Sequence, residues 1–176
     1  LLDAGLAATG KIVMLEPRRI AARAAARRMA MTRGEHAGET VGYAVRHERK
    51  VSMKRRIEVV TEGLLTRRLQ ADPALSDVSI VIFDEFHERT LDGDLALALT
   101  LDARNGLRPD LKILVMSATL DAARLSEFLG GAPVVKAPGR VFPVETFYGA
   151  RAMAKSLAEP MARQIATALR EQEGSV

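Results

Sequence analysis

The apolar run at residues 78–83, Val-Ser-Ile-Val-Ile-Phe, constrains the fold most, because it ends directly in the acid pair Asp84-Glu85. Its β-branched and aromatic residues favour a strand, and a short apolar run is typical of a strand buried on both faces of a parallel sheet. Open α/β sheets bind ligands at the carboxyl edge of such strands. The sequence therefore predicts two carboxylates at a ligand-binding edge.

Similar apolar runs alternate with segments rich in Ala, Leu and Arg, which favour helices. This alternation predicts an α/β fold with an open parallel sheet flanked by helices. Strands are expected at Ile12–Leu15, Ile57–Val60, Val78–Phe83, Ile113–Met116 and Val134–Val135, and helices at Arg19–Met31, Glu62–Gln70, Asp94–Arg104, Asp121–Leu129 and about Ala152–Gln172. An edge strand or hairpin is expected between Thr40 and Arg56, and an extended segment at Val141–Glu145.

Composition excludes several classes of protein. The chain has no cysteine and three scattered histidines, which rules out disulfides and thiolate metal sites and argues against a zinc site. No apolar stretch approaches the roughly 20 residues that a membrane-spanning helix needs, and no signal peptide is recognisable, so a cytoplasmic protein without membrane contact is expected. A formal charge of +4 permits a nucleic-acid partner without requiring one.

Polar segments follow four of the predicted strands, at residues 16–19, 61–63, 84–85 and 117–119. Packing gives no reason for this shared character, so a functional surface at one sheet edge is expected. Adjacent carboxylates there fit a Walker-B arrangement, in which Asp84 holds Mg²⁺, directly or through water, and Glu85 polarises the water that attacks the γ-phosphate of a nucleotide. The simpler alternative is that Asp84 and Glu85 are ordinary charged residues of a loop that follows a core strand.

Five ordered segments carry a resemblance to a known family. They are Leu15–Arg23, Val41-Gly42-Tyr43 with Arg46, Thr61–Arg67, Asp84–Arg89 with the sequence Asp-Glu-Phe-His-Glu-Arg, and Ser117-Ala118-Thr119. In order and spacing they resemble the motifs of the DEAH-box family of superfamily 2 helicases, most closely the bacterial HrpB type. The resemblance implies the first RecA-like domain of an ATP-dependent RNA or DNA helicase.

The resemblance also implies roles for individual residues. Asp84 and Glu85 would bind Mg²⁺ and ATP, with Glu85 orienting the attacking water, and His87 would sense the γ-phosphate or bridge to a second RecA-like domain of the same protein. Ser117 and Thr119 would couple hydrolysis to domain closure. The backbone of one nucleic-acid strand, with RNA favoured over DNA, would contact Pro17, Arg18, Arg19, Thr61, Gly63 and Arg67.

The segment Gly5–Ile12 is a near match to a phosphate-binding loop of the form G-x-x-x-x-G-K-[S/T]. We expect it not to bind phosphate, because Ile12 replaces the hydroxyl residue and the segment leads into a strand, whereas a phosphate loop opens a helix. The chain is therefore expected to be a P-loop fold without its first strand and phosphate loop, with Leu1–Leu6 as the tail of the helix that this loop would open. Residues 1–143 would be the truncated first domain and residues 144–176 the linker and first helix toward the second.

These expectations imply that the chain alone hydrolyses no ATP. A rival hypothesis is a non-catalytic module that binds single-stranded nucleic acid or a protein partner. A third, a P-loop ATPase that is not a helicase, accounts for Asp84-Glu85 but leaves the polar loops after the other strands unexplained. The oligomeric state is not predicted.

Overall fold

The computed structural model describes residues 1–7, 10–118, 122–137, 139, 143, 146, 148 and 157–171. Strands and helices alternate over most of this part of the chain, as the sequence predicts. The strands are β1 Lys11–Leu15, β2 Val41–Val45, β3 Glu48–Lys50, β4 Ile57–Val60, β5 Val78–Phe83 and β6 Lys112–Val115. The helices are α1 Arg19–Thr32, α2 Glu62–Ala71, α3 Leu91–Gly106, α4 Ala122–Phe128 and α5 Ala158–Glu171, with a short 3₁₀ turn, η1, at Phe86–Glu88.

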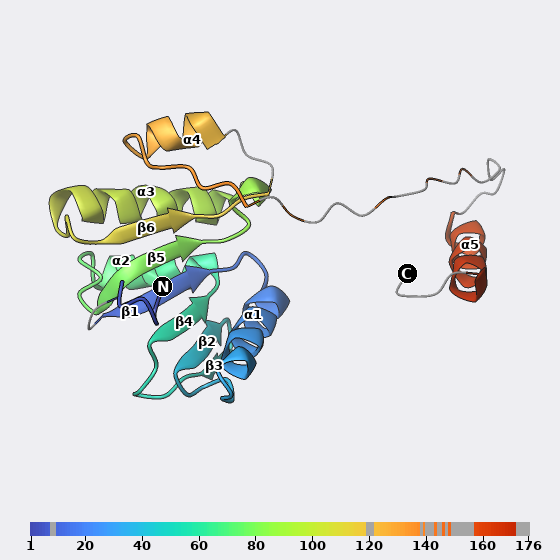
Figure 1. The fold of residues 1–176 in the computed structure, drawn as a ribbon, viewed down its shortest axis with the longest axis horizontal. Helices are drawn as coiled ribbons and strands as arrows, with labels where there is room; N and C mark the ends of the chain where they lie inside the picture. Colours follow the sequence, from blue (N-terminus) through green and yellow to red (C-terminus); the bar gives the residue numbers. More distant parts are fainter. Residues whose placement is uncertain are drawn as a thin grey trace. The chain divides into compact units, whose positions relative to one another are not determined.

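The strands form one sheet in the order β3-β2-β4-β1-β5-β6 (Figure 1). All neighbouring pairs are parallel except β2 and β3, which are antiparallel. The hairpin expected between Thr40 and Arg56 is therefore confirmed. Only Arg46 and His47 separate its two strands, and a loop this short permits only an antiparallel return.

Helices cover both faces of the sheet. The buried alanines Ala22, Ala26 and Ala30 recur every four residues on α1, and they pack against β2 and β4. On the opposite face, Leu65 and Leu69 of α2 join α3 in a core with alternate residues of β1 and β5. Consequently the helices that follow β1 and β5 lie on opposite faces of the sheet.

Two expectations about the later part of the chain are corrected. Val134–Val135 is not a strand, and Val135 is 90% exposed. Two β-branched residues alone do not make a strand, because a strand needs a hydrogen-bonded neighbour. The helix expected at Asp121–Leu129 ends at Phe128, and Leu157, within the helix expected from about Ala152, precedes α5. Residues 121, 152–156, 172 and most of Val141–Glu145 lie outside the described residues.

The chain divides into two compact units, Leu1–Val134 and Val135–Val176. The expected domain division between residues 143 and 144 falls where few residues are described, and it stays a prediction. Within the described part of the chain, no helix combines the length and the apolar character needed to cross a membrane.

The first residues form a turn with a glycine in the left-handed conformation. Gly5 has φ 69°, its N–H donates to Leu2 C=O, and Leu6 N–H donates to Leu1 C=O. These two bonds are those of a Schellman motif, which ends helices. A Cβ on Gly10 would lie 2.0 Å from Ser79 Oγ, so this glycine is required by close packing beside β5. The expectation that the segment leads into a strand is confirmed, since Lys11 begins β1.

Candidate functional site

The carboxyl ends of four strands lie in one row of the sheet. Leu15 is paired in register with Val60 on one side and with Phe83 on the other, and Phe83 is paired with Val115. The residues that follow these strands therefore emerge side by side, which confirms the expected shared edge. Because the connections leave β1 and β5 toward opposite faces, the edge has its topological switch point between these two strands.

Glu16 and Asp84 meet at this switch point. The register continues for one residue beyond the strands, because Asp84 N–H donates to Leu15 C=O at 3.1 Å and Glu16 N–H donates to Val60 C=O at 3.0 Å. Glu16 is a charged residue only 5% exposed. Burial, and then the charge of Asp84 and a hydrogen bond with it, raise the pKa of Glu16 to about 7. The edge thus brings a buried carboxyl against the first residue of the predicted acid pair.

The second residue of the pair begins a strained turn, which we call the acidic turn, residues 84–89. Glu85 has φ 49° and Arg89 has φ 48°, so non-glycine residues in the left-handed region stand on both sides of η1. Such residues persist only where surrounding contacts hold them. One contact is the bond from Phe86 N–H to Met116 C=O at 3.1 Å, which ties the turn to the end of β6. The turn leaves the Glu85 side chain 48% exposed at the sheet edge.

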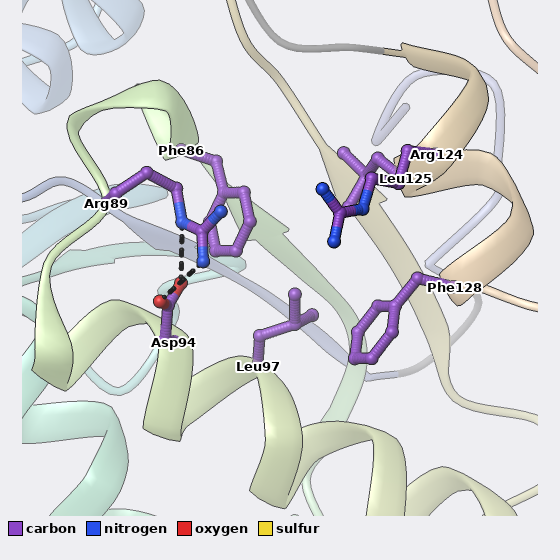
Figure 2. A pocket seen from close by; sticks show the side chains of 7 residues that line it. All are labelled: Phe86, Arg89, Asp94, Leu97, Arg124, Leu125 and Phe128. Carbon is purple, nitrogen blue, oxygen red and sulfur yellow. Dashed lines mark hydrogen bonds and ion pairs between the residues drawn. The ribbon is translucent and has the colours of Figure 1, made fainter.

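A clamp of three side chains supports the far end of the acidic turn (Figure 2). Arg89 Nε and Nη2 donate to the two carboxylate oxygens of Asp94 at 3.2 and 2.8 Å. The guanidinium carbon lies 5.7 Å from the ring centre of Phe86, and this ring packs edge-on against Phe83. The clamp forms one wall of a cavity of about 460 Å³, which is lined by Phe86, Arg89, Asp94, Leu97, Arg124, Leu125 and Phe128.

His87 links the acidic turn to the segment after β6. Its Nδ1 accepts a hydrogen bond from Ala118 N–H at 3.5 Å and lies 3.3 Å from Glu85 Oε2. Ser117, one of the two predicted coupling residues, is exposed beside this contact in the sequence. Thr119, the other, lies outside the described residues.

The acidic residues of this edge fit a magnesium ion that is completed by other ligands. Among the described residues, no three acidic or histidine side chains converge as they would in a metal site made by protein alone. Mg²⁺ is usually held by one or two carboxylates together with waters and substrate phosphates. Asp84 and Glu85 are the residues that could supply oxygen ligands for a site of that kind.

A second part of the edge is a cleft of about 610 Å³, which we call the strand cleft. It is lined by Pro17, Arg19, Val45, Arg46, His47, Thr61, Glu62, Gly63, Leu64, Arg67 and Asp92. Five of the six residues predicted to contact nucleic acid are among these. The sixth, Arg18, forms an ion pair with Glu88 instead, with Nη2 3.1 Å from Oε1. This pair ties the loop after β1 to the acidic turn.

The sequence left two features of the edge unassigned. Glu16 directly follows β1, as Asp84 directly follows β5, and this position at a strand end was a signal in the sequence. Bringing the two side chains together also requires that β1 and β5 be neighbours, with Leu15 opposite Phe83. Arg46 and His47 line the strand cleft from the tip of the β2–β3 hairpin. Arg46 belongs to a segment that carries the family resemblance, but neither residue could be placed at this edge without knowing that the hairpin ends there.

The comparisons with known proteins agree with this geometry. No protein-family model matches the chain. Over 167 residues, 95% of its length, the chain is 53% identical to the ATP-dependent RNA helicase HrpB of Escherichia coli (strain K12), and it spans 21% of that protein.

Two solved structures of E. coli HrpB, one described as a DEAH/RHA helicase and one as a DExH-box NTPase, resemble the chain with TM-scores of 0.86 and 0.74. Each is 53% identical, and the likeness covers 95% of this chain and 21% of the HrpB chain. The chain is therefore similar over nearly its whole length to a segment of HrpB, a DEAH/RHA helicase, and it has the α/β RecA-like fold that the motifs predicted.

Proposed function

We propose that this chain is part of an ATP-dependent nucleic-acid helicase, in which it supplies the metal-binding and water-orienting carboxylates and contacts one nucleic-acid strand. The observation that carries the proposal is the placement of Asp84 and Glu85 beside β1 at the switch point of the sheet. Ligands of open α/β sheets bind at that point. The likeness to HrpB supports the same reading.

The acid pair divides the work of hydrolysis. Bound Mg²⁺-ATP supplies the reactive γ-phosphoryl group and the charge that offsets its negative oxygens. Asp84, which directly follows β5, would hold the metal. Glu85 is exposed at the edge, where its carboxylate orients the attacking water and accepts hydrogen bonds from it. The left-handed backbone at Glu85 presents this side chain to the edge.

Coupling to movement runs through the contact between the acidic turn and the segment after β6. His87 accepts a hydrogen bond from Ala118 N–H, so a shift of the acidic turn moves the residue that follows Ser117. We propose that Ser117 and Thr119 pass this shift to a second RecA-like domain of the same protein, and that His87 senses the γ-phosphate.

The strand cleft contacts the phosphate backbone of a single strand. Arg19 and Arg67 provide charge, and Thr61 and Gly63 stand at the N-terminus of α2, where backbone N–H groups favour phosphates. Contacts of this kind read no sequence, so binding is non-specific and weakens with salt. RNA is favoured over DNA because the relative is described as an RNA helicase.

The chain alone is expected to sustain no ATP hydrolysis, because the near match Gly5–Ile12 leads into β1 and opens no helix. The test compares ATP turnover by this chain and by a longer form that carries the phosphate loop and the second domain, each with and without single-stranded RNA. Glu85→Gln should abolish turnover by the longer form. Glu127→Gln, the same change at an exposed position of α4, is the control and should leave turnover intact.

Three outcomes decide the proposal. RNA-stimulated turnover by the longer form alone, lost in Glu85→Gln, supports it. Turnover that survives Glu85→Gln contradicts the role of that residue. If neither form hydrolyses ATP but RNA still binds with a steep salt dependence, the protein is a non-catalytic binding module.

A further inference from the structure

A buried carboxylate on β4 gathers three arginines. The Glu58 side chain is 4% exposed. Arg55 Nε donates to Glu58 Oε2 at 3.0 Å, Arg68 Nη1 donates to the same oxygen at 3.3 Å, and Arg49 Nη2 lies 3.5 Å from Oε1. A buried carboxylate needs a paired charge and hydrogen bonds, which Arg55 and Arg68 already provide. Arg49 is therefore a third positive charge beside Glu58, in addition to the two that its burial requires.

These three residues, which we call the arginine cluster, carry a surplus of positive charge. Arg68 also forms an ion pair with Asp77, and Asp77 forms one with Lys11. Four cationic side chains thus face two carboxylates, which leaves two positive charges. The Arg49 side chain is 61% exposed, and the contact with Glu58 is its one ion pair among the described residues. Its guanidinium has five N–H donors, which is more than this contact uses.

The arginine cluster lines a cleft of about 650 Å³ on the face of the sheet that carries α2. Glu48 also lines this cleft, and its carboxylate is paired with Arg23, whose Nη1 lies 3.0 Å from Glu48 Oε2. Val45, His47 and Leu64 line both this cleft and the strand cleft. The two clefts therefore adjoin at the tip of the β2–β3 hairpin. A chain of phosphates that occupies the strand cleft has a direct continuation beside α2 toward the arginine cluster.

We propose that Arg49, Arg55 and Arg68 form a second phosphate-binding subsite, which takes a phosphodiester of the same single strand that occupies the strand cleft. The inference rests on the proposed function. Glu58 holds Arg55 and Arg68 in fixed positions, and their side chains are 12% and 23% exposed. The part of each guanidinium that reaches the cleft is therefore oriented before the strand arrives, which lowers the entropy lost on binding. Arg49 supplies the mobile charge at the mouth of the subsite.

The test measures binding of a fluorescently labelled 12-nucleotide oligouridylate to this chain by fluorescence anisotropy. The KCl concentration is varied from about 50 to about 300 mM, a range over which binding to phosphates changes strongly. Arg49→Gln removes the charge and keeps the fold, since the side chain is largely exposed. One lost contact with a single strand should lower the slope of log affinity against log salt by about 0.7 and the affinity at 0.1 M salt about fivefold. Arg49→Lys should keep most of the slope.

Arg28→Gln is the matched control, because Arg28 is exposed on α1, which covers the opposite face of the sheet. Its slope should equal that of the unchanged chain, and urea midpoints should show that all variants fold alike. A normal slope in Arg49→Gln, with salt-dependent binding by the unchanged chain, overturns the subsite and leaves the proposed function standing. Absence of salt-dependent binding by the unchanged chain overturns both.

Discussion

Replacing Glu16 by Gln tests the reading of the switch point through the stability of the chain. Burial and the neighbouring Asp84 raise the pKa of Glu16 from 4.5 to about 7 in the folded state. The folded chain therefore holds a proton on Glu16 between pH 4.5 and 7 that the unfolded chain has released. Stability from this group is complete below pH 4.5 and is lost as the pH rises through 7.

The size of the effect follows from the two pKa values. Each pKa unit corresponds to about 1.4 kcal/mol, so ionised Glu16 lowers the free energy of unfolding by up to about 3 kcal/mol above pH 7. Gln has nearly the same shape and never ionises. Glu16→Gln should thus be more stable than the unchanged chain by about 1–3 kcal/mol at pH 8, by less than about 1 kcal/mol at pH 5 and by almost nothing at pH 4.

The assay is urea unfolding at about pH 4, 5, 6, 7 and 8, a range that includes both pKa values of Glu16. Constant ionic strength and the absence of Mg²⁺ are required, because a bound cation would offset the repulsion between Glu16 and Asp84. Glu127→Gln, an exposed glutamate on α4, should follow the unchanged chain at every pH. A difference between Glu16→Gln and the unchanged chain that stays constant with pH would refute the reasoning.

Three further changes test the acidic turn and the strand cleft. Asp94→Asn in the longer, active form should lower kcat by about 10–100-fold with little change in KM, because the clamp on Arg89 sets the position of the acidic turn. Thr90→Ala should lower the free energy of unfolding by about 1 kcal/mol, measured in urea, since the Thr90 hydroxyl accepts from Gly93 N–H at 3.0 Å and caps α3. Gly63→Ala should keep stability, because a Cβ there meets no atom within 4 Å, but should weaken RNA binding measured by anisotropy.

Each of these changes has either a control within the chain or an outcome that would contradict it. Asp110 accepts two hydrogen bonds from Arg108, as Asp94 does from Arg89, but it lies away from the acidic turn, so Asp110→Asn should leave kcat unchanged. An equal loss of kcat in Asp94→Asn and Asp110→Asn would show a general effect of lost ion pairs. If Thr90→Ala no longer unfolded cooperatively, the prediction that the Thr90 cap contributes only about 1 kcal/mol would be wrong. Unchanged RNA binding by Gly63→Ala would remove that residue from the strand cleft.

Local pattern was sufficient for most of the fold. The strands at Ile57–Val60 and Val78–Phe83 begin and end where their apolar runs do, because burial on both faces of a parallel sheet selects such runs directly. The strand predicted at Val134–Val135 was wrong because local pattern was not sufficient there. β-Branched residues favour a strand only where a partner strand exists, and the sequence carries no record of partners.

The candidate site was predictable to the same depth. Asp84 and Glu85 were predicted as site residues because they follow a strand, and the shared edge followed from the parallel arrangement. Burial of Glu16 beside Asp84 depends on β1 and β5 being neighbours in a particular register. The contact of Arg18 with Glu88 depends on side-chain direction. Neither has a signature in local sequence.

The conformation of the acidic turn shows why its sequence signature extends beyond the acid pair. Glu85 and Arg89 have side chains that disfavour the left-handed region, and each residue held there costs about 1–3 kcal/mol. That cost is offset by contacts made outside the pair: the Phe86 ring in the core and the Asp94 carboxylate on α3. A chain that kept Asp84 and Glu85 but lost these supports would keep the proposed metal ligands and lose their placement.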